Sequence, residues 1–541
     1  MVLPRVKTCK NTDKWFEGHL IFPENNDGIL ASTLFSLFFP GFPATSGKNP
    51  NVLLKPTSFA HGGEYRLDVA ENHICMAYSD YEGLRNAVAT LSGYSLQGKI
   101  RCVFISDYPD NAFRSCLLDL ARGYVGIEEL KEHLLRLAKL KFNHVHLHLM
   151  DRQSYILQSD VVPNPDHHKQ YSKQELREIV SFCNLLSLDA IPEIEFPTHA
   201  VNLLKALPEL RCDIIDPEKA IHDVAAVGNP KKVNYIHNGI SSWAVCVGKE
   251  STYKVYEDII DELIPIFDSE YIHIGGDEIA FDHLGAFPHW DNCHACKALM
   301  ERYSKDILSV YHHGIRRIHE IVKSRGKRTI KWNDERECEH AIDLPTDIIL
   351  EYWRSDQAEN AQAHINRFIE KGYQVINAQY QYTYIDQPHY MTAEKIQTWS
   401  PSKGESQESA ILGGEMCAWE LGNKEYAFYD YILPICMVLF SDRVWNKDEA
   451  EYDAEYIRAI IRTILGDNSL QANPLSIFDG IIPPRKADAT EVLSCGGVPL
   501  QEISEIISAL NLVEASGYYG KIALDKLTDH LIALRHVIQN I

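Results

Sequence analysis

Short apolar runs that end in polar, charged or aromatic residues recur along the middle of the chain. Amphipathic stretches separate most of them, and the stretch EELKEHLLRLAKLK, from Glu128 to Lys141, carries apolar residues at helical spacing. Short apolar strands that alternate with helices are typical of a parallel sheet. The eight runs begin at Cys116, His144, Asp189, Tyr271, Thr329, Ile348, Gln374 and Ile411.

Eight strand–helix units in succession predict an α/β fold of the (β/α)8 TIM-barrel type. We place this barrel at residues 109–446. Residues 1–108 contain short strands and one helical stretch, YEGLRNAVATL, which predict a small α/β domain ending at a proline-bearing linker. Residues 447–541 carry apolar stripes at helical spacing and predict a helical C-terminal region.

The composition narrows the range of partners. The chain has 541 residues and a formal net charge of −22, which argues against nucleic acid and anionic membrane surfaces because like charges repel. The apolar run Ile432–Phe440 is too short to span a bilayer and predicts a buried element. The sequence does not decide whether the protein is a homo-oligomer, since the C-terminal helices could pack on the barrel or on a second subunit.

The thirteen cysteines are odd in number and scattered, which predicts reduced, mostly buried thiols rather than a disulfide framework. The N-terminus has no apolar signal region, so we expect a cytoplasmic chain, or a secreted or periplasmic one if a signal was removed. Cys293 and Cys296 have CxxC spacing without a second pair at zinc-site spacing, and we interpret them as structural or incidental. No metal or cofactor is expected.

The stretch HIGGDE, residues 273–278, ends an apolar run in two glycines and two adjacent acids. A turn needs only glycine with one Asp or Asn, and neighbouring acids repel each other, so Asp277 and Glu278 indicate chemistry. Function in a TIM barrel lies at the carboxyl ends of the strands, so other polar and aromatic residues there are candidates. They are Asp119, Arg122, His146, His148, Asp151, Glu193, Glu195, His199, His273, Trp332, Trp353, Tyr384, Asp386, Glu415, Trp419 and Glu420.

This set favours cleavage of a glycosidic bond, because aromatic faces stack on sugar rings and acids carry out the proton transfers. One alternative is a metal-dependent hydrolase, in which the HVHLH run, His199, His273 and Asp277 form a metal site. A second alternative is a carbohydrate-binding barrel without catalysis. Such a protein would keep the aromatic residues and Arg122 without needing Glu278.

The order of the motifs resembles glycoside hydrolase family 20, the β-N-acetylhexosaminidases. The matching segments cover about residues 110 to 445, and the end of the preceding domain is also similar. They are LLDLARGY, KFNHVHLHLMD, IPEIEFPTHA, HIGGDE, IKWND, YTYID and GGEMCAWE.

The resemblance implies an exo-acting, retaining hydrolase that removes terminal β-linked N-acetylhexosamine, GlcNAc or GalNAc, from a glycan or glycoconjugate. The nucleophile would be the acetamido oxygen of the substrate itself, an exception to the scheme with two enzyme carboxylates. By resemblance, Glu278 would be the general acid and base, and Asp277 would hold the acetamido N–H. Tyr384 would donate to the acetamido oxygen, and Asp151 and His199 would form a relay behind Glu278.

The resemblance also implies the residues that bind the terminal sugar. Arg122 would bind the C3 and C4 hydroxyls, Asp386 a ring hydroxyl, and Trp332, Trp353 and Trp419 would enclose the acetamido methyl group.

The chain departs from the family pattern at three places. Arg152 follows Asp151 where a second acid is usual, Thr198 stands before His199 where Gly is usual, and Glu420 directly follows Trp419. The last departure puts the hydroxyl-binding role of Glu420 in doubt. Because the changes cluster near the expected C4, C6 and neighbouring-sugar positions, we predict an altered substrate preference with the core chemistry kept.

Overall fold

The computed structural model describes the N-terminal and barrel segments of the chain. The described residues are 4–96, 98–213, 244–279, 290–303, 307–334, 337–338, 342–354, 361–385, 396, 399–402, 408–422 and 429–447. Nearly all of the predicted helical C-terminal region, from residue 448 onward, lies outside them.

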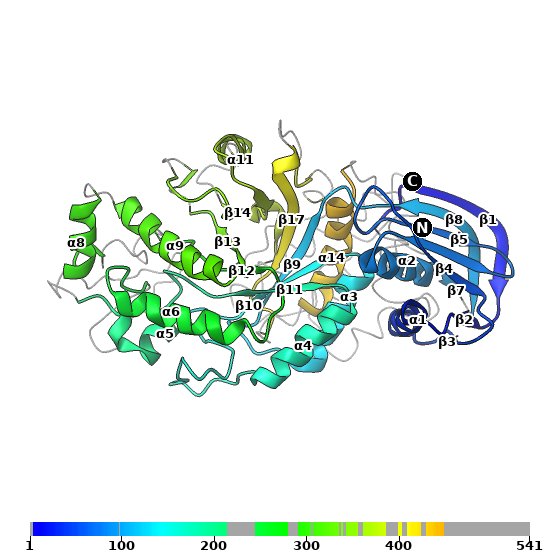
Figure 1. Ribbon diagram of the computed structural model, residues 1–541, viewed down its shortest axis with the longest axis horizontal. Coiled ribbons are helices and arrows are strands. Elements are labelled where there is room, and N and C mark those ends of the chain that lie inside the picture. Colours follow the sequence, from blue (N-terminus) through cyan, green and yellow to red (C-terminus); the bar gives the residue numbers. More distant parts are fainter. Residues whose placement is uncertain are drawn as a thin grey trace, which may run out of the picture.

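Eight parallel strands form a closed barrel, which confirms the predicted fold class (Figure 1). The last strand, β17, pairs with both β9 and β15 and so closes the sheet. Each predicted run overlaps one of these strands. The strands are β9 (Phe113–Asp119), β10 (His144–His148), β11 (Asp189–Glu193), β12 (Tyr271–His273), β13 (Arg328–Trp332), β14 (Ile349–Tyr352), β15 (Val375–Asn377) and β17 (Ile411–Ala418).

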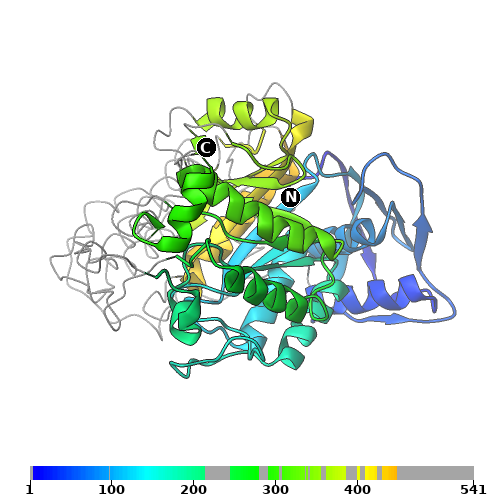
Figure 2. The same cartoon turned by 60° about the vertical axis from the view of Figure 1, so that its left-hand side comes forward.

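Helices surround the strands, as the amphipathic stretches predict (Figure 2). The larger ones are α3 (Ile127–Lys139), α4 (Lys173–Leu185), α6 (Glu250–Leu263), α9 (Ile307–Ser324), α11 (Ala361–Glu370) and α14 (Tyr429–Trp445). Shorter elements are α5 (Val201–Ala206), η1 (Pro208–Leu210), α8 (His294–Arg302), α12 (Tyr380–Thr383), β16 (Tyr384–Ile385) and η3 (Glu408–Ala410). The apolar run Ile432–Phe440 lies in α14, where its described side chains are buried. None of the helices in the described ranges combines the length and apolar character that a membrane span requires.

The interior of the barrel is layered. A buried apolar cluster comes from six strands and consists of Phe113, Ile191, Tyr271, Ile330, Ile349 and Ile376. Side chains two residues apart on a strand point to the same face, so Glu193, His273 and Glu351 lie in the next layer, above Ile191, Tyr271 and Ile349. These groups pair with one another and with His146 and Glu415. The carboxyl end of the barrel is therefore polar, while its other end is apolar.

A second sheet precedes the barrel. Its strands are β1 (Thr8–Glu17), β8 (Lys99–Asp107), β5 (Tyr65–Val69), β6 (Ile74–Tyr78) and β4 (Val52–Pro56), and β7 (Ser95–Leu96) pairs with β8. The helices α1 (Asn26–Phe38) and α2 (Tyr81–Gly93) and the pair β2 (Leu20–Phe22) and β3 (Ala44–Ser46) complete this part. The helix α2 contains the predicted stretch YEGLRNAVATL and packs against α3 of the barrel. The domain boundaries themselves stay predictions.

A buried ionic network joins the N-terminal sheet to the barrel. The Asp107 carboxylate at the end of β8 accepts from Lys141 Nζ at 2.9 Å, Tyr65 Oη at 2.8 Å and Trp445 Nε1 at 3.0 Å. Lys141 is 1% exposed and Asp107 is fully buried. The carboxylate at the end of β8 thus holds three other segments, which are β5, the α3–β10 turn and the end of α14.

Cys293 and Cys296 have neighbours that their spacing in the sequence does not reveal. The structure brings Cys212 and Cys246 beside them, and the four sulfur atoms lie within 4.8 Å of one another. The sequence spacing concealed this cluster because Cys246 lies 47 residues before Cys293, on another loop.

Candidate active site

The two glycines of HIGGDE allow the chain to turn sharply after β12. Gly275 has a φ of +68°, and a Cβ atom there would lie 2.1 Å from Glu195 Oε2. Gly276 has a φ of +105°, and its Cβ would lie 3.0 Å from Lys331 Cε. Both positions favour glycine because the backbone conformation would strain any other residue, and at Gly275 a side chain would also clash.

Contacts from two neighbouring segments, the end of β13 and α9, fix the acid-bearing loop, residues 275–279. The Gly275 carbonyl accepts from Trp332 N–H at 2.9 Å, and the Gly276 carbonyl accepts from the Tyr311 hydroxyl at 2.6 Å. Ile279 N–H donates to Asp334 Oδ2 at 2.9 Å. Glu278 itself has a φ of +54°, a conformation that costs energy for a non-glycine residue and is found mainly at functional sites.

Thr198 also holds this loop. Its buried hydroxyl donates to the backbone carbonyl of Asp277. One of the three departures from the family pattern thus acts on the backbone of the acid pair.

His199 connects the acid pair to the interior. Its Nε2 lies 3.3 Å from Glu278 Oε2 and 3.5 Å from Asp277 Oδ2, and its Nδ1 lies 3.1 Å from Asp151 Oδ2. Burial alone would lower the pKa of His199, but the charges of Asp151, Asp277 and Glu195 raise it well above its usual value. The surrounding carboxylates therefore favour the protonated imidazolium of His199, and Asp151 positions it against Glu278.

Arg122 is held between two buried carboxylates. Its Nη2 lies 2.7 Å from Asp151 Oδ2, and its Nη1 donates to Asp119 Oδ2 at 3.0 Å. The guanidinium also lies over the ring of Trp419, 4.8 Å from its centroid. Burial would raise the pKa of Asp151, but Arg122 and His199 lower it well below its usual range. A cation fixed in this way can donate to sugar hydroxyls with little loss of side-chain entropy.

The predicted aromatic residues form one cluster, made of Trp332, Trp353, Trp419 and Tyr384. The rings of Trp353 and Tyr384 are stacked at 6.1 Å, and Tyr384 meets Trp419 edge to face at 5.6 Å. Trp332 Nε1 donates to Glu193 Oε1 at 2.7 Å, which fixes the orientation of that ring. A rigid aromatic wall of this kind suits a small apolar group such as a methyl.

The short strand β16 places Tyr384. Tyr384 pairs with Cys417 of β17, and Trp419 N–H donates to the Ile385 carbonyl at 3.2 Å. This pairing brings Tyr384 beside the eighth strand although it follows the seventh in sequence. Asp386, the next candidate, lies outside the described residues.

Glu420 joins the site through its backbone. Its N–H donates to Asp119 Oδ2 at 2.8 Å, and its φ is +59°. Asp119 thus ties Glu420 to Arg122 and also accepts from His148 Nδ1 at 2.9 Å.

Two residues that sequence reasoning left without a role are central to this arrangement. Asp119 organises Arg122 and Glu420, as described above. Glu195 Oε1 accepts a hydrogen bond from His148 Nε2 at 3.0 Å. Burial together with the charge of Asp277 raises the pKa of Glu195 to about 8. A signal existed for both, since each is an acid at the end of an apolar strand, but only the contacts distinguish them from their neighbours.

Asn333 has a similar supporting role. Its Oδ1 accepts from Trp353 N–H at 2.9 Å, and its carbonyl accepts from Trp353 Nε1 at 2.7 Å. The motif IKWND therefore supplies Trp332, the support of Trp353, and Asp334 as the anchor of the acid-bearing loop.

The geometry disfavours the metal-hydrolase alternative. His273 bonds Glu193 on the interior layer, while His199 faces the acid pair, and in the described part of the chain no candidate metal group combines the two histidines. Burial would lower the pKa of His146, but Glu415 and Glu193 raise it to about 9. His146 lies between two carboxylates, 2.8 Å from Glu415 Oε1 and 3.1 Å from Glu193 Oε2, and acts as their ion-pair partner.

Comparison with known families gives a match over the barrel. The model of the family described as glycosyl hydrolase family 20, catalytic domain, matches residues 111–448.

Curated relatives bear the name β-hexosaminidase. The protein of Vibrio furnissii is 27% identical over 365 residues, which are 62% of this chain and 55% of the relative. The protein of Akkermansia muciniphila is 27% identical over 392 residues, covering 66% of this chain and 73% of the relative. The chain therefore spans little more than half the length of the Vibrio furnissii relative.

Solved structures share the fold. The exo-β-N-acetylglucosaminidase of Vibrio harveyi, solved with N-acetylglucosamine, has a TM-score of 0.73 at 20% identity, covering 87% of this chain and 77% of that one. The β-N-acetylhexosaminidase of Bacteroides fragilis has a TM-score of 0.70 at 21% identity, covering 87% of this chain and 96% of that one.

Proposed function

The chain belongs to glycosyl hydrolase family 20, and on that basis we propose that it removes terminal β-linked N-acetylhexosamine from a glycan or glycoconjugate. The observation that carries the proposal is a continuous set of contacts across the carboxyl end of the barrel. It runs from Glu278 through His199, Asp151 and Arg122 to Trp419 and the aromatic cluster. Acid, cation and aromatic cluster are thus linked at one end of the barrel, which supports cleavage of an N-acetylated sugar.

The first step uses the substrate's own acetamido group. Its carbonyl oxygen attacks the anomeric carbon, the glycosidic bond breaks, and the leaving oxygen takes a proton from Glu278. Asp277 binds the acetamido N–H and stabilises the positive charge of the oxazolinium intermediate. The adjacent position of the two acids fits this scheme, because neither has to attack from the opposite face of the sugar.

The second step reverses the proton transfer. Water attacks the anomeric carbon, Glu278 accepts a proton from that water, and the acetamido group is restored, so the configuration is retained. The cationic His199 at 3.3 Å stabilises the Glu278 carboxylate that exists between the two steps.

The remaining residues position the sugar. Trp332, Trp353 and Trp419 enclose the acetamido methyl group, Tyr384 donates to the acetamido oxygen, and Arg122 binds the C3 and C4 hydroxyls. Asp386 is proposed as a further hydroxyl ligand. The family scheme supports these roles, and so does the packing of the four aromatic residues into one cluster.

The test is replacement of the acid with its neutral isostere, Glu278→Gln. We expect kcat/KM on an aryl β-N-acetylglucosaminide to fall by at least about 10²-fold, because general acid–base catalysis contributes roughly that much. The matched control is Glu270→Gln, an exposed glutamate just before the opposite end of the same strand. Wild-type turnover by Glu278→Gln would refute the assignment, and so would an equal loss in both variants.

A further inference from the structure

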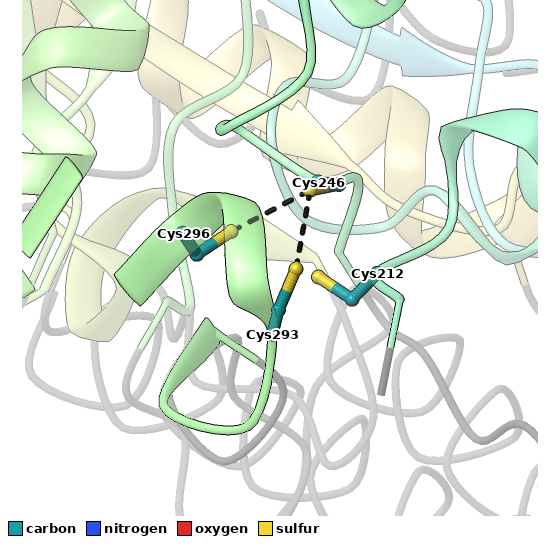
Figure 3. A group of neighbouring side chains, drawn as sticks. All are labelled: Cys212, Cys246, Cys293 and Cys296. Atoms are coloured by element: carbon teal, nitrogen blue, oxygen red, sulfur yellow. Dashed lines mark hydrogen bonds between the residues drawn. The ribbon is translucent and has the colours of Figure 1, made fainter. Parts of the chain in front are cut away.

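Four buried cysteines from three separate segments meet beside the barrel (Figure 3). Cys212 follows η1, Cys246 precedes α6, and Cys293 and Cys296 lie at the start of α8. Each is at most 3% exposed, and none is part of the proposed chemistry. Burial of four thiols in one place without disulfide bonds needs an explanation, because an isolated structural cysteine normally packs among apolar side chains.

The distances fit a metal ion better than a disulfide. Cys246 Sγ lies 3.5 Å from Cys296 Sγ and 3.7 Å from Cys293 Sγ. A disulfide would require about 2.05 Å. Four thiolates around Zn²⁺ at about 2.3 Å stand about 3.8 Å apart, as tetrahedral geometry requires.

The backbone around the cluster is fixed by contacts other than the sulfur atoms. Cys246 N–H donates to the Leu210 carbonyl at 2.8 Å, which joins two of the segments. Lys249 Nζ donates to the Arg211 carbonyl at 2.7 Å and to Asp213 Oδ1 at 2.9 Å, on either side of Cys212.

The third segment is held in the same way. Trp290 Nε1 donates to the Val245 carbonyl at 3.1 Å. A Cβ on Gly248 would lie 2.5 Å from the Ala295 carbonyl carbon, so the backbones carrying Cys246 and Cys296 approach as closely as glycine allows. The site is therefore preorganised by all three loops.

We propose that Cys212, Cys246, Cys293 and Cys296 bind one Zn²⁺ ion. Zinc is the metal that tetrahedral all-sulfur sites of this kind commonly take. Four protein ligands leave no open position for water or substrate, so the ion is structural. It links the segment after β11 with the segment after β12.

The zinc site lies close to the segment that carries His199. Val245, next to Cys246, donates its N–H to the Pro197 carbonyl at 2.9 Å, two residues before His199. Cys293 follows Glu278 on the same connection after β12. The ion would therefore hold the segment that contacts Pro197, close to the histidine beside the acid pair.

Metal analysis of the full chain, purified without added metal, tests the proposal. We expect one zinc per chain, released stoichiometrically when an organomercurial titrates the thiols and detected with a chromogenic chelator. Cys246→Ala and Cys293→Ala should lose the zinc, whereas Cys183→Ala, a buried cysteine in α4, should keep it. Exchange with Co²⁺ should give the intense visible absorption of a tetrahedral thiolate site.

Several results would overturn the proposal. They are substoichiometric zinc in the wild type even after refolding with Zn²⁺, iron in its place, a disulfide among the four cysteines in the intact mass, or zinc retained by Cys246→Ala. The release titration uses the wild-type chain, so it decides the question even if the cysteine variants do not fold. Because metal content is the readout, failure of the proposed glycosidase activity would leave this result unchanged.

Discussion

At the scale of single residues, buried carboxylates position the side chains that we expect to act on the substrate. His199 reaches Glu278, but its charge depends on Asp151, and Asp151 is shared with Arg122 at 2.7 Å. Asp119 holds the other side of Arg122 and the backbone of Glu420. Buried carboxylates that do not contact the sugar therefore preorganise the residues that bind it in our scheme.

The pairing of Asp151 with His199 predicts a pH effect. The raised pKa keeps His199 charged at low and neutral pH, and the charge is lost as pH rises through that pKa. In Asp151→Asn one of the carboxylates that raise this pKa is removed, so His199 loses its proton at lower pH. We expect the alkaline limb of the kcat/KM profile to move to lower pH, with kcat/KM falling by roughly 10- to 100-fold as for other orienting carboxylates.

Asp166→Asn is the control for this shift. Asp166 is an exposed acid 3.6 Å from the surface residue His168, outside the site. An alkaline limb that stays in place in Asp151→Asn, or moves equally in Asp166→Asn, would contradict the assigned relay.

At the scale of elements, the strand ends decide which side chains meet. Eight apolar runs and the helical pattern between them suffice to predict the barrel. The spacing of apolar residues and the alternation of strands with helices can both be read directly from the sequence. The predicted acid pair, His199, Arg122 and aromatic residues do come together, since the carboxyl ends of parallel strands share one edge. The short strand β16 could not be predicted from two residues, and its pairing with β17 is what brings Tyr384 to Trp419.

Features that depend on contacts between separate segments could not be predicted from the sequence. The roles of Asp119, Glu195 and Thr198 depend on contacts between different strands, which no local pattern records. The cysteine cluster joins three loops in the same way, so the CxxC pair alone does not reveal its two partners.

The turn after β12 supports a matched pair of substitutions. Gly275→Ala places a Cβ 2.1 Å from Glu195 Oε2 at a φ of +68°, whereas Gly326→Ala has a φ of +73° and nothing within 4 Å. In both variants the left-handed conformation lowers the free energy of unfolding by about 1–2 kcal/mol. Only Gly275→Ala should lose further stability and most of its activity, because the clash displaces the acid-bearing loop.

Urea unfolding and kcat/KM measured on the two variants check this expectation. Equal stability together with equal activity would show that the approach of Gly275 to Glu195 does not matter.

At the scale of the whole molecule, the N-terminal sheet and the barrel are joined by a buried ion pair. Asp107 is fully buried and meets Lys141 Nζ at 2.9 Å, so removing the carboxylate leaves a buried ammonium without its counter-charge. We expect Asp107→Ala to destabilise the protein by about 3–5 kcal/mol. A double variant, Asp107→Leu with Lys141→Met, should recover part of the loss, since it removes the unpaired buried charge, although Tyr65 Oη and Trp445 Nε1 still lose this acceptor.

The midpoint of thermal unfolding measures both effects. The control is Glu71→Ala, which removes a surface ion pair with Lys14 and should leave the midpoint unchanged. A single variant as stable as the wild type, or a double variant less stable than the single one, would contradict the role given to this joint.

The central claim is that the substrate supplies the nucleophile. The most direct measurement compares hydrolysis of two aryl β-glycosides, the N-acetylglucosaminide and the plain glucoside, which differ only at C2. The account predicts rapid cleavage of the first and negligible cleavage of the second, because only the first carries the acetamido oxygen that Asp277, Tyr384 and the aromatic cluster are proposed to hold. Equal cleavage of both would contradict it, since an enzyme nucleophile would then have to exist.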